Sequence, residues 1–107
     1  MKEKLLEILE GKKVEDIAIY DLRMKSALFD FFIVGTVSSS KQVYAIFDEI
    51  KKSGIDIHHI EETSDGGWTL IDCFDIVMHL FTEQKRKEYD LDSLWKETEK
   101  KREGGSQ

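Results

Sequence analysis

Asp72 and Asp75 are the two side chains with the best spacing for metal-assisted chemistry. They lie where two apolar runs meet, so a tight hairpin between the runs would bring their carboxylates close enough to share a divalent cation. The competing interpretation is stronger, because Asp is common in turns, where its side chain hydrogen-bonds the local backbone. Two carboxylates without a third ligand or a phosphate-binding loop carry little specificity. We therefore predict no catalytic residues, no metal site and no cofactor.

Ligand types suited to zinc occur at His58, His59, Cys73 and His79. They lack the closely paired spacing of a structural zinc motif, so a zinc site is not expected. Cys73 has no recognisable His and acid arrangement, which favours a small apolar filler over a nucleophile. His79 alternates with apolar Val77 and Phe81, which leaves two interpretations open. It is either a partly buried, hydrogen-bonded residue or part of a partner-facing patch.

The segment from Gly35 to Ser40 follows an apolar run and precedes a helical pattern, as phosphate-binding loops do. Gly35 is its only glycine, and the β-branched Val37 resists the positive φ angles that such loops often need. The three serines at positions 38–40 are instead typical of a helix N-cap. Helix capping is therefore favoured over anion binding.

The elements that must position these residues follow from hydrophobic periodicity. Met1–Glu10 has the pattern of an amphipathic helix that ends at Gly11. Val14–Leu22 alternates in part and predicts a strand with one wetter face at an edge of the sheet. Phe29–Thr36 is rich in aromatic and β-branched residues and predicts a central strand. Apolar residues at helical spacing then predict a helix from the serines to Ser53–Gly54.

The second half of the chain predicts three strands and short helices. Ile55–Ile60 alternates as a strand would, and a turn-rich loop at 63–67 follows. Trp68–Cys73 and Asp75–Phe81 predict a β-hairpin with a very short connection. Beyond Thr82 the pattern becomes polar and favours short helices. This order indicates the α/β class, with α+β organisation and a mixed sheet. We expect a single domain over residues 1–97 and a flexible, charged tail over residues 98–107.

The composition limits the function classes. The chain has 107 residues, with 16 basic and 22 acidic ones, for a net charge of -6. This charge opposes capture of phosphate backbones, so little direct nucleic-acid binding is expected, whereas a basic protein partner is allowed. The lone cysteine and the lack of a signal-peptide pattern or a long apolar run favour the cytoplasm and disfavour membrane residence.

A long motif identifies a family resemblance. Trp68–Phe81 has the spacing Trp-x-Leu-x-Asp-x-x-Asp-x-Val-x-His-x-Phe, and Arg86–Trp95 continues it with Arg-x-x-Tyr-x-Leu-x-x-Leu-Trp. With the earlier run at Asp30–Val34, the chain resembles the Iojap-like ribosomal silencing factors from about Val14 to Trp95. It departs from them at a few positions. The family usually has Gly at the positions of Val37, Glu62 and Phe74, and Arg-His where this chain has Lys41-Gln42.

The resemblance implies a nucleotidyltransferase-like fold without catalysis. It implies docking on the fourteenth protein of the large ribosomal subunit, steric block of subunit joining and repression of translation, and it allows a homodimer. Aromatic residues and Arg often dominate interface centres, so we expect the second-half sheet and the segment after it to contact the partner. The residues expected to bind the partner are Trp68, Leu70, His79, Phe81, Arg86, Tyr89 and Trp95.

Two alternatives stay open. A small metal-dependent nucleotidyltransferase-like or nucleotide-binding enzyme would use the serine loop together with Asp72 and Asp75. A generic dimeric adaptor would bind a protein but would not co-sediment with large ribosomal subunits.

Overall fold

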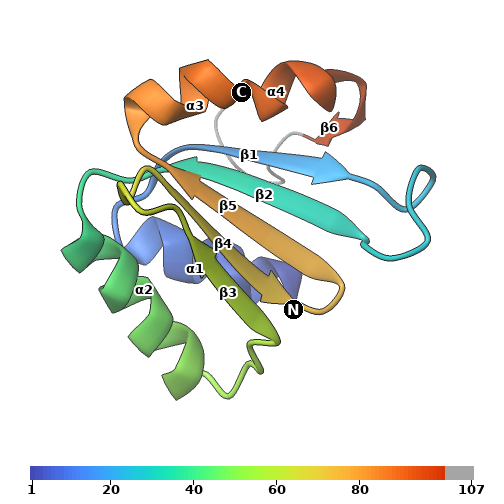
Figure 1. The fold of residues 1–107 in the computed structure, drawn as a ribbon. Helices are drawn as coiled ribbons and strands as arrows, with labels where there is room; N and C mark the ends of the chain where they lie inside the picture. The colour runs from blue at the N-terminus through green and yellow to red at the C-terminus, as the bar shows by residue number, and fades with distance from the viewer. Residues whose placement is uncertain (101–107) are drawn as a thin grey trace.

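Two helices cover one face of the sheet. The structure is a computed structural model and describes residues 1–100. Helix α1 (Lys2–Gly11) buries Leu5, Leu6, Ile8 and Leu9, and helix α2 (Ser40–Lys52) buries Val43, Ile46 and Ile50. Both helices pack on the same side of the sheet (Figure 1). The apolar spacing that predicted these helices therefore forms the main core.

The sheet has six strands in the order β3-β4-β5-β2-β1-β6. They are β1 (Glu15–Asp21), β2 (Phe31–Thr36), β3 (His59–Glu62), β4 (Trp68–Cys73), β5 (Ile76–Phe81) and β6 (Glu99–Lys100). β2 and β5 pair in parallel, and every other neighbouring pair is antiparallel. The predicted mixed sheet, the central position of β2 and the β4–β5 hairpin are confirmed.

Two strand predictions are wrong. The strand expected at Ile55–Ile60 is β3, which begins at His59, while Ile55 and Ile57 pack against the core from a loop. The strand expected at the edge, β1, has β6 on its outer side, where Glu99 pairs with Tyr20. Three residues of the expected tail are thus ordered, with Thr98 in a 3-10 turn and Glu99 and Lys100 in the sheet, and residues 101–107 of that tail lie outside the described residues.

Short helices follow β5 and lie over the second face of the sheet. They are α3 (Glu83–Tyr89), α4 (Leu91–Leu94) and the 3-10 turn η1 (Lys96–Thr98). The Thr82 hydroxyl accepts a hydrogen bond from the Lys85 amide and so caps α3, which ends at Asp90 in a left-handed conformation. Figure 1 shows α3 and α4 across one part of the sheet only. Among residues 1–100, no helix is long and apolar enough to cross a bilayer.

Candidate protein-docking face

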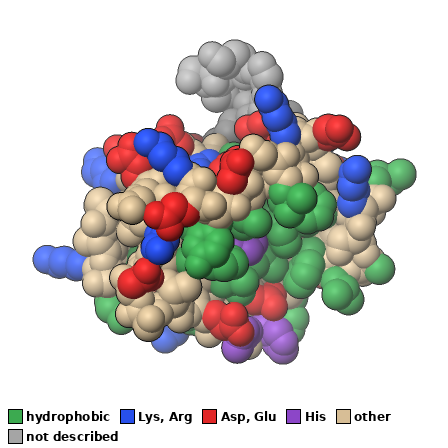
Figure 2. Space-filling view, turned by 45° about the horizontal axis from the view of Figure 1, so that its top comes forward, with side chains coloured by type: hydrophobic (Ala, Val, Ile, Leu, Met, Phe, Trp, Pro, Cys, Tyr) green, Lys and Arg blue, Asp and Glu red, His purple; other side chains and the backbone are tan. Residues whose placement is uncertain are grey.

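The second face of the sheet carries a second apolar cluster that helices cover only in part. Because side chains alternate along a strand, Leu70 of β4, His79 of β5 and Val34 of β2 lie side by side on this face. Phe32, Trp68 and Trp95 are half-buried there. We call the region around Trp68, Leu70 and Phe32 the open face. Figure 2 shows hydrophobic side chains gathered there with a histidine among them.

Two shallow hollows mark the open face, and they share Leu70 and Glu61. One has a volume of about 130 Å³, and the other, which contains His79, has a volume of about 230 Å³. Each is smaller than the roughly 300–1,000 Å³ of typical small-molecule sites. A face with shallow, mostly apolar hollows is better suited to contact with another protein than to binding a small ligand.

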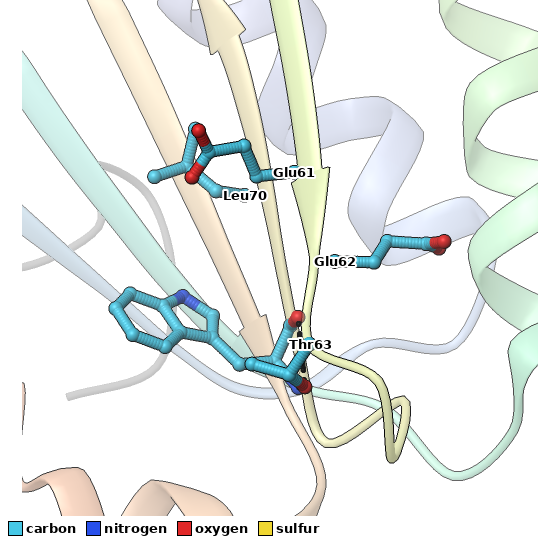
Figure 3. Close-up of a pocket in the computed structure, with 5 residues that line it drawn as sticks. Glu61, Glu62, Thr63 and Leu70 are labelled. Carbon is cyan, nitrogen blue, oxygen red and sulfur yellow. Dashed lines mark hydrogen bonds between the residues drawn. The ribbon is translucent and has the colours of Figure 1, made fainter.

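Acidic side chains border the open face on the β3 side. Glu61 and Asp72 line the hollow that contains His79, and among residues 1–100 no Lys or Arg lines either hollow. The Glu61 carboxylate lies 2.9 Å from His59 Nε2. Figure 3 shows Glu61 beside Leu70, while Glu62 points away from both. An apolar centre with an acidic border is complementary to a partner that carries basic residues around an apolar contact.

A hydrogen bond fixes two of the expected partner-binding residues to each other. The Trp68 indole N–H donates to His79 Nδ1 at 3.2 Å. His79 is only 5% exposed, and burial lowers its pKa to about 4. The imidazole is therefore neutral at pH 7. His79 Nε2 has no hydrogen-bond partner among the described residues.

Two aromatic residues after β5 extend the open face. The Tyr89 ring lies 4.7 Å from the Trp68 ring and remains 46% exposed. The Trp95 ring meets the Phe32 ring edge-on at 5.8 Å. Phe81, by contrast, is fully buried beneath Trp68, with ring centroids 5.3 Å apart. The structure thus brings Trp68, Leu70 and His79 together with Tyr89 beside them, and it places Phe81 in the core.

Arg86 is engaged within the chain. Its guanidinium donates to both carboxylate oxygens of Asp92 at 3.0 Å, to the Thr36 hydroxyl at 2.9 Å and to the Asp16 carbonyl at 2.6 Å. Asp16 lies in a bulge of β1, where the register shifts. Tyr20 also donates to Asp92. Burial opposes ionisation of Asp92, but the hydrogen bonds from Arg86 and Tyr20 hold its pKa below the usual value. Arg86 therefore joins α3 and α4 to the sheet.

Several lining residues were not predicted from the sequence. Phe29, Phe32 and Val77 line the hollow that contains His79. Phe32 was assigned to a strand covered on both faces, and nothing in its local pattern shows that the covering helices stop short of it. Asp72 and Val77 belong to the family motif, which was the available signal for them.

The other candidate sites have structural explanations. Asp72 Oδ1 accepts a hydrogen bond from the Phe74 amide at 2.9 Å, as expected of a turn aspartate. Within residues 1–100, no group of three His, Cys, Asp or Glu residues could hold a metal ion. Cys73 is buried in the α1–α2 core, and burial raises its pKa to about 11. Ser39 accepts a hydrogen bond from the Gln42 amide at 3.2 Å, which confirms helix capping.

The fold and the site together define a small, mixed α/β domain with a partly uncovered apolar sheet face. The chain belongs to the family described as "Ribosomal silencing factor during starvation", which matches residues 1–106. Proteins named "Ribosomal silencing factor RsfS" are 36% identical to it in Halalkalibacterium halodurans and in Bacillus subtilis. The first match covers 81% of this chain and 78% of the relative, and the second covers 80% and 76%.

A solved structure agrees with this assignment. A crystal structure of a protein from Chromobacterium violaceum is 32% identical and matches with a TM-score of 0.78, over 99% of this chain and 85% of that one. The resemblance to ribosomal silencing factors is thus confirmed. The names of the relatives describe a regulatory function rather than an enzyme.

Proposed function

We propose that this chain binds the large ribosomal subunit through its fourteenth ribosomal protein and sterically blocks joining of the small subunit, which represses translation. Membership of the silencing-factor family supports this proposal. The structural observation that carries it is the open face, where Leu70 and Trp68 stay partly exposed although the Tyr89 ring of α3 lies against Trp68. Steric exclusion needs affinity and bulk at the right place but no bond-making.

The charge of the chain fits a partner of this kind. Ribosomal proteins are commonly basic, and the acidic border at Glu61 and Asp72 would meet basic side chains around the contact. The net charge of -6 also discourages binding to ribosomal RNA. The partner-facing residues that we propose are Trp68, Leu70, His79, Tyr89 and Trp95. Phe81 and Arg86 support them, since both are engaged inside the chain.

A sucrose-gradient experiment tests the function. Purified protein is mixed with separated large subunits before small subunits are added under conditions that permit joining. We expect the protein to migrate with the large subunit and the joined peak to shrink as its concentration rises. Unchanged joining together with no migration on the large subunit would contradict the proposal.

We also place the protein in the cytoplasm and allow a homodimer. Residues 1–97 carry all the residues that we propose to face the partner, and β6 adds Glu99 and Lys100 to the same sheet. The resemblance also implies a nucleotidyltransferase-like fold. The enzyme alternative predicts metal-dependent nucleotide binding, which calorimetry with ATP and Mg²⁺ would detect and an Asp72→Asn variant would abolish.

A further inference from the structure

His79 occupies the centre of the open face and not its margin. It pairs with Leu70 across β4 and with Val34 across β2, and it lines the larger of the two hollows. Its other surroundings are aromatic, since the Phe32 ring meets the imidazole edge-on at 4.7 Å. The His79 ring, which is nine-tenths or more buried, thus has mostly apolar neighbours, while His59, Glu61 and Asp72 line the same hollow.

The hydrogen bond from Trp68 determines which nitrogen of His79 carries the proton. An indole N–H can only donate, so His79 Nδ1 must accept and be unprotonated. In a neutral imidazole the hydrogen then resides on Nε2. This Nε2–H group is buried and makes no hydrogen bond within residues 1–100. A buried donor without an acceptor is uncommon in folded proteins and calls for an explanation.

We propose that His79 Nε2–H is a specificity-determining donor that receives an oxygen acceptor from the docked protein. The inference rests on the proposed function, since it concerns the same face. The partner segment would insert apolar side chains beside Leu70 and Phe32, place a backbone carbonyl, amide or hydroxyl oxygen at Nε2, and direct basic side chains to Glu61 and Asp72. A partner with a donor or a purely apolar group at this point would leave Nε2–H unpaired and is disfavoured.

Docking must move a side chain to reach this donor. Nε2 is covered in the free chain, and half-buried Phe32 has the ring whose centroid lies nearest that of the His79 ring, at 4.7 Å. Side-chain rotamer changes at interfaces are common even where the backbone stays fixed. We therefore expect the Phe32 side chain to turn aside on docking, which would open the hollow above His79.

Binding to purified large ribosomal subunits tests the inference with two variants. His79→Phe keeps an aromatic ring but has no donor, whereas His79→Gln keeps an N–H near the position of Nε2. We expect His79→Phe to weaken binding by roughly tenfold or more, because the acceptor of the partner is left unpaired. His79→Gln should weaken this binding clearly less than His79→Phe does. Equal affinity of His79→Phe and wild type, or equal losses in both variants, would overturn the inference.

The possible results distinguish failure of the inference about His79 from failure of the proposed function. Wild-type protein that fails to bind large subunits contradicts the proposed function, and the inference falls with it. Wild-type binding that is insensitive to His79→Phe contradicts the inference alone. Circular dichroism confirms that each variant is folded.

Nitrogen-15 spectra of the histidine side chains in the wild type provide a second test, which does not depend on the folding of any variant. We expect the free chain to show protonated Nε2 and unprotonated Nδ1 at His79. Adding the purified fourteenth ribosomal protein should shift the Nε2–H resonance. A free chain with the proton on Nδ1, or an Nε2–H resonance that stays unchanged at saturating ribosomal protein, would overturn the inference.

Discussion

At the scale of single residues, the buried imidazole of His79 makes stability depend on pH. Its pKa in the folded chain is about 4, against an ordinary value of 6.5, because burial disfavours the charged ring. The unfolded chain therefore binds more protons than the folded chain between these two values. The contribution of His79 is complete above pH 6.5 and is lost as the pH falls toward 4.

We expect the free energy of unfolding to fall by up to about 3 kcal/mol from this group alone between pH 7 and pH 4. Urea unfolding of wild type and His79→Phe at several pH values measures it. The difference in the free energy of unfolding between the two proteins should shrink, or reverse in favour of the variant, as the pH falls, because Phe cannot be protonated. A difference that is constant from pH 7 to pH 4 would contradict the assignment.

Phe74 is a second residue whose effect on the free energy of unfolding can be measured. It lies at the β4–β5 turn with a φ angle of 72°, a left-handed conformation that favours Gly, and its side chain is 51% exposed. We expect Phe74→Gly to raise the free energy of unfolding by about 1 kcal/mol, because it relieves backbone strain. Thermal or urea unfolding measures the change.

Phe74→Ala is the matched control, since it removes the contact between the Phe74 and His58 rings but keeps the strained backbone. Phe74→Ala should not raise the free energy of unfolding. An equal rise for Phe74→Ala and Phe74→Gly would show that the Phe side chain, and not the φ angle, lowers the stability of the wild type.

At the scale of elements, Arg86 determines how α3 and α4 sit on the sheet. It is 15% exposed, and its hydrogen bonds reach β1, β2 and α4. Removing it leaves the Asp92 carboxylate and the Asp16 carbonyl without these donors. Since α4 precedes Trp95, loss of Arg86 should also loosen one side of the open face.

We expect Arg86→Ala to lower the free energy of unfolding by about 2 kcal/mol, since charged hydrogen bonds of this kind are lost. Lys85→Ala is the control on the same helix, because Lys85 makes exposed ion pairs with Asp65 and Glu88. Exposed pairs contribute little, so the control should change stability much less. Similar losses in both variants would contradict a structural role for Arg86.

The elements also show what could be predicted from the sequence. The α1 and α2 helices and the β4–β5 hairpin carry strong periodic signals and were predicted close to their observed bounds. Ile55 and Ile57 alternate in the same way but pack from a loop, because alternation reports which side chains are buried and not which backbone groups pair. β6 is short and charged, so it has no apolar signal at all.

The site was predicted only in part, because local patterns do not show how the elements pack. Trp68, Leu70 and His79 came from the family motif, and the structure brings them together. Phe81 and Arg86 belong to the same motif and are of types that often dominate interfaces, yet their surroundings depend on tertiary packing that residue type does not reveal. The exposure of Phe32 depends on where α3 and α4 end over the sheet, which no local pattern encodes.

At the scale of the whole molecule, the two faces of the sheet predict different effects of the same chemical change. Leu70 lies on the open face, whereas Tyr44 is 55% exposed on α2, on the other side of the sheet. We expect Leu70→Glu to weaken binding to large ribosomal subunits by about 2 kcal/mol or more, because a charge would enter the apolar centre of the contact.

Tyr44→Glu should leave that binding near the wild-type value, since α2 faces away from the proposed contact. Co-sedimentation measures both variants, and circular dichroism checks their fold. Equal weakening by the two substitutions would place the contact elsewhere or indicate a general loss of structure.

The parallel pairing of β2 with β5 has a consequence for the synthesis of this protein. It joins residues that are distant along the chain, such as Phe31 and Ile76, which lie about 45 positions apart, and such pairing slows folding. The open face needs both strands as well as Tyr89 and Trp95 near the end of the described chain. A nascent chain therefore cannot complete this face until the residues through Trp95 have left the exit tunnel. We expect a protein of this design to gain affinity for ribosomes only once that segment has emerged.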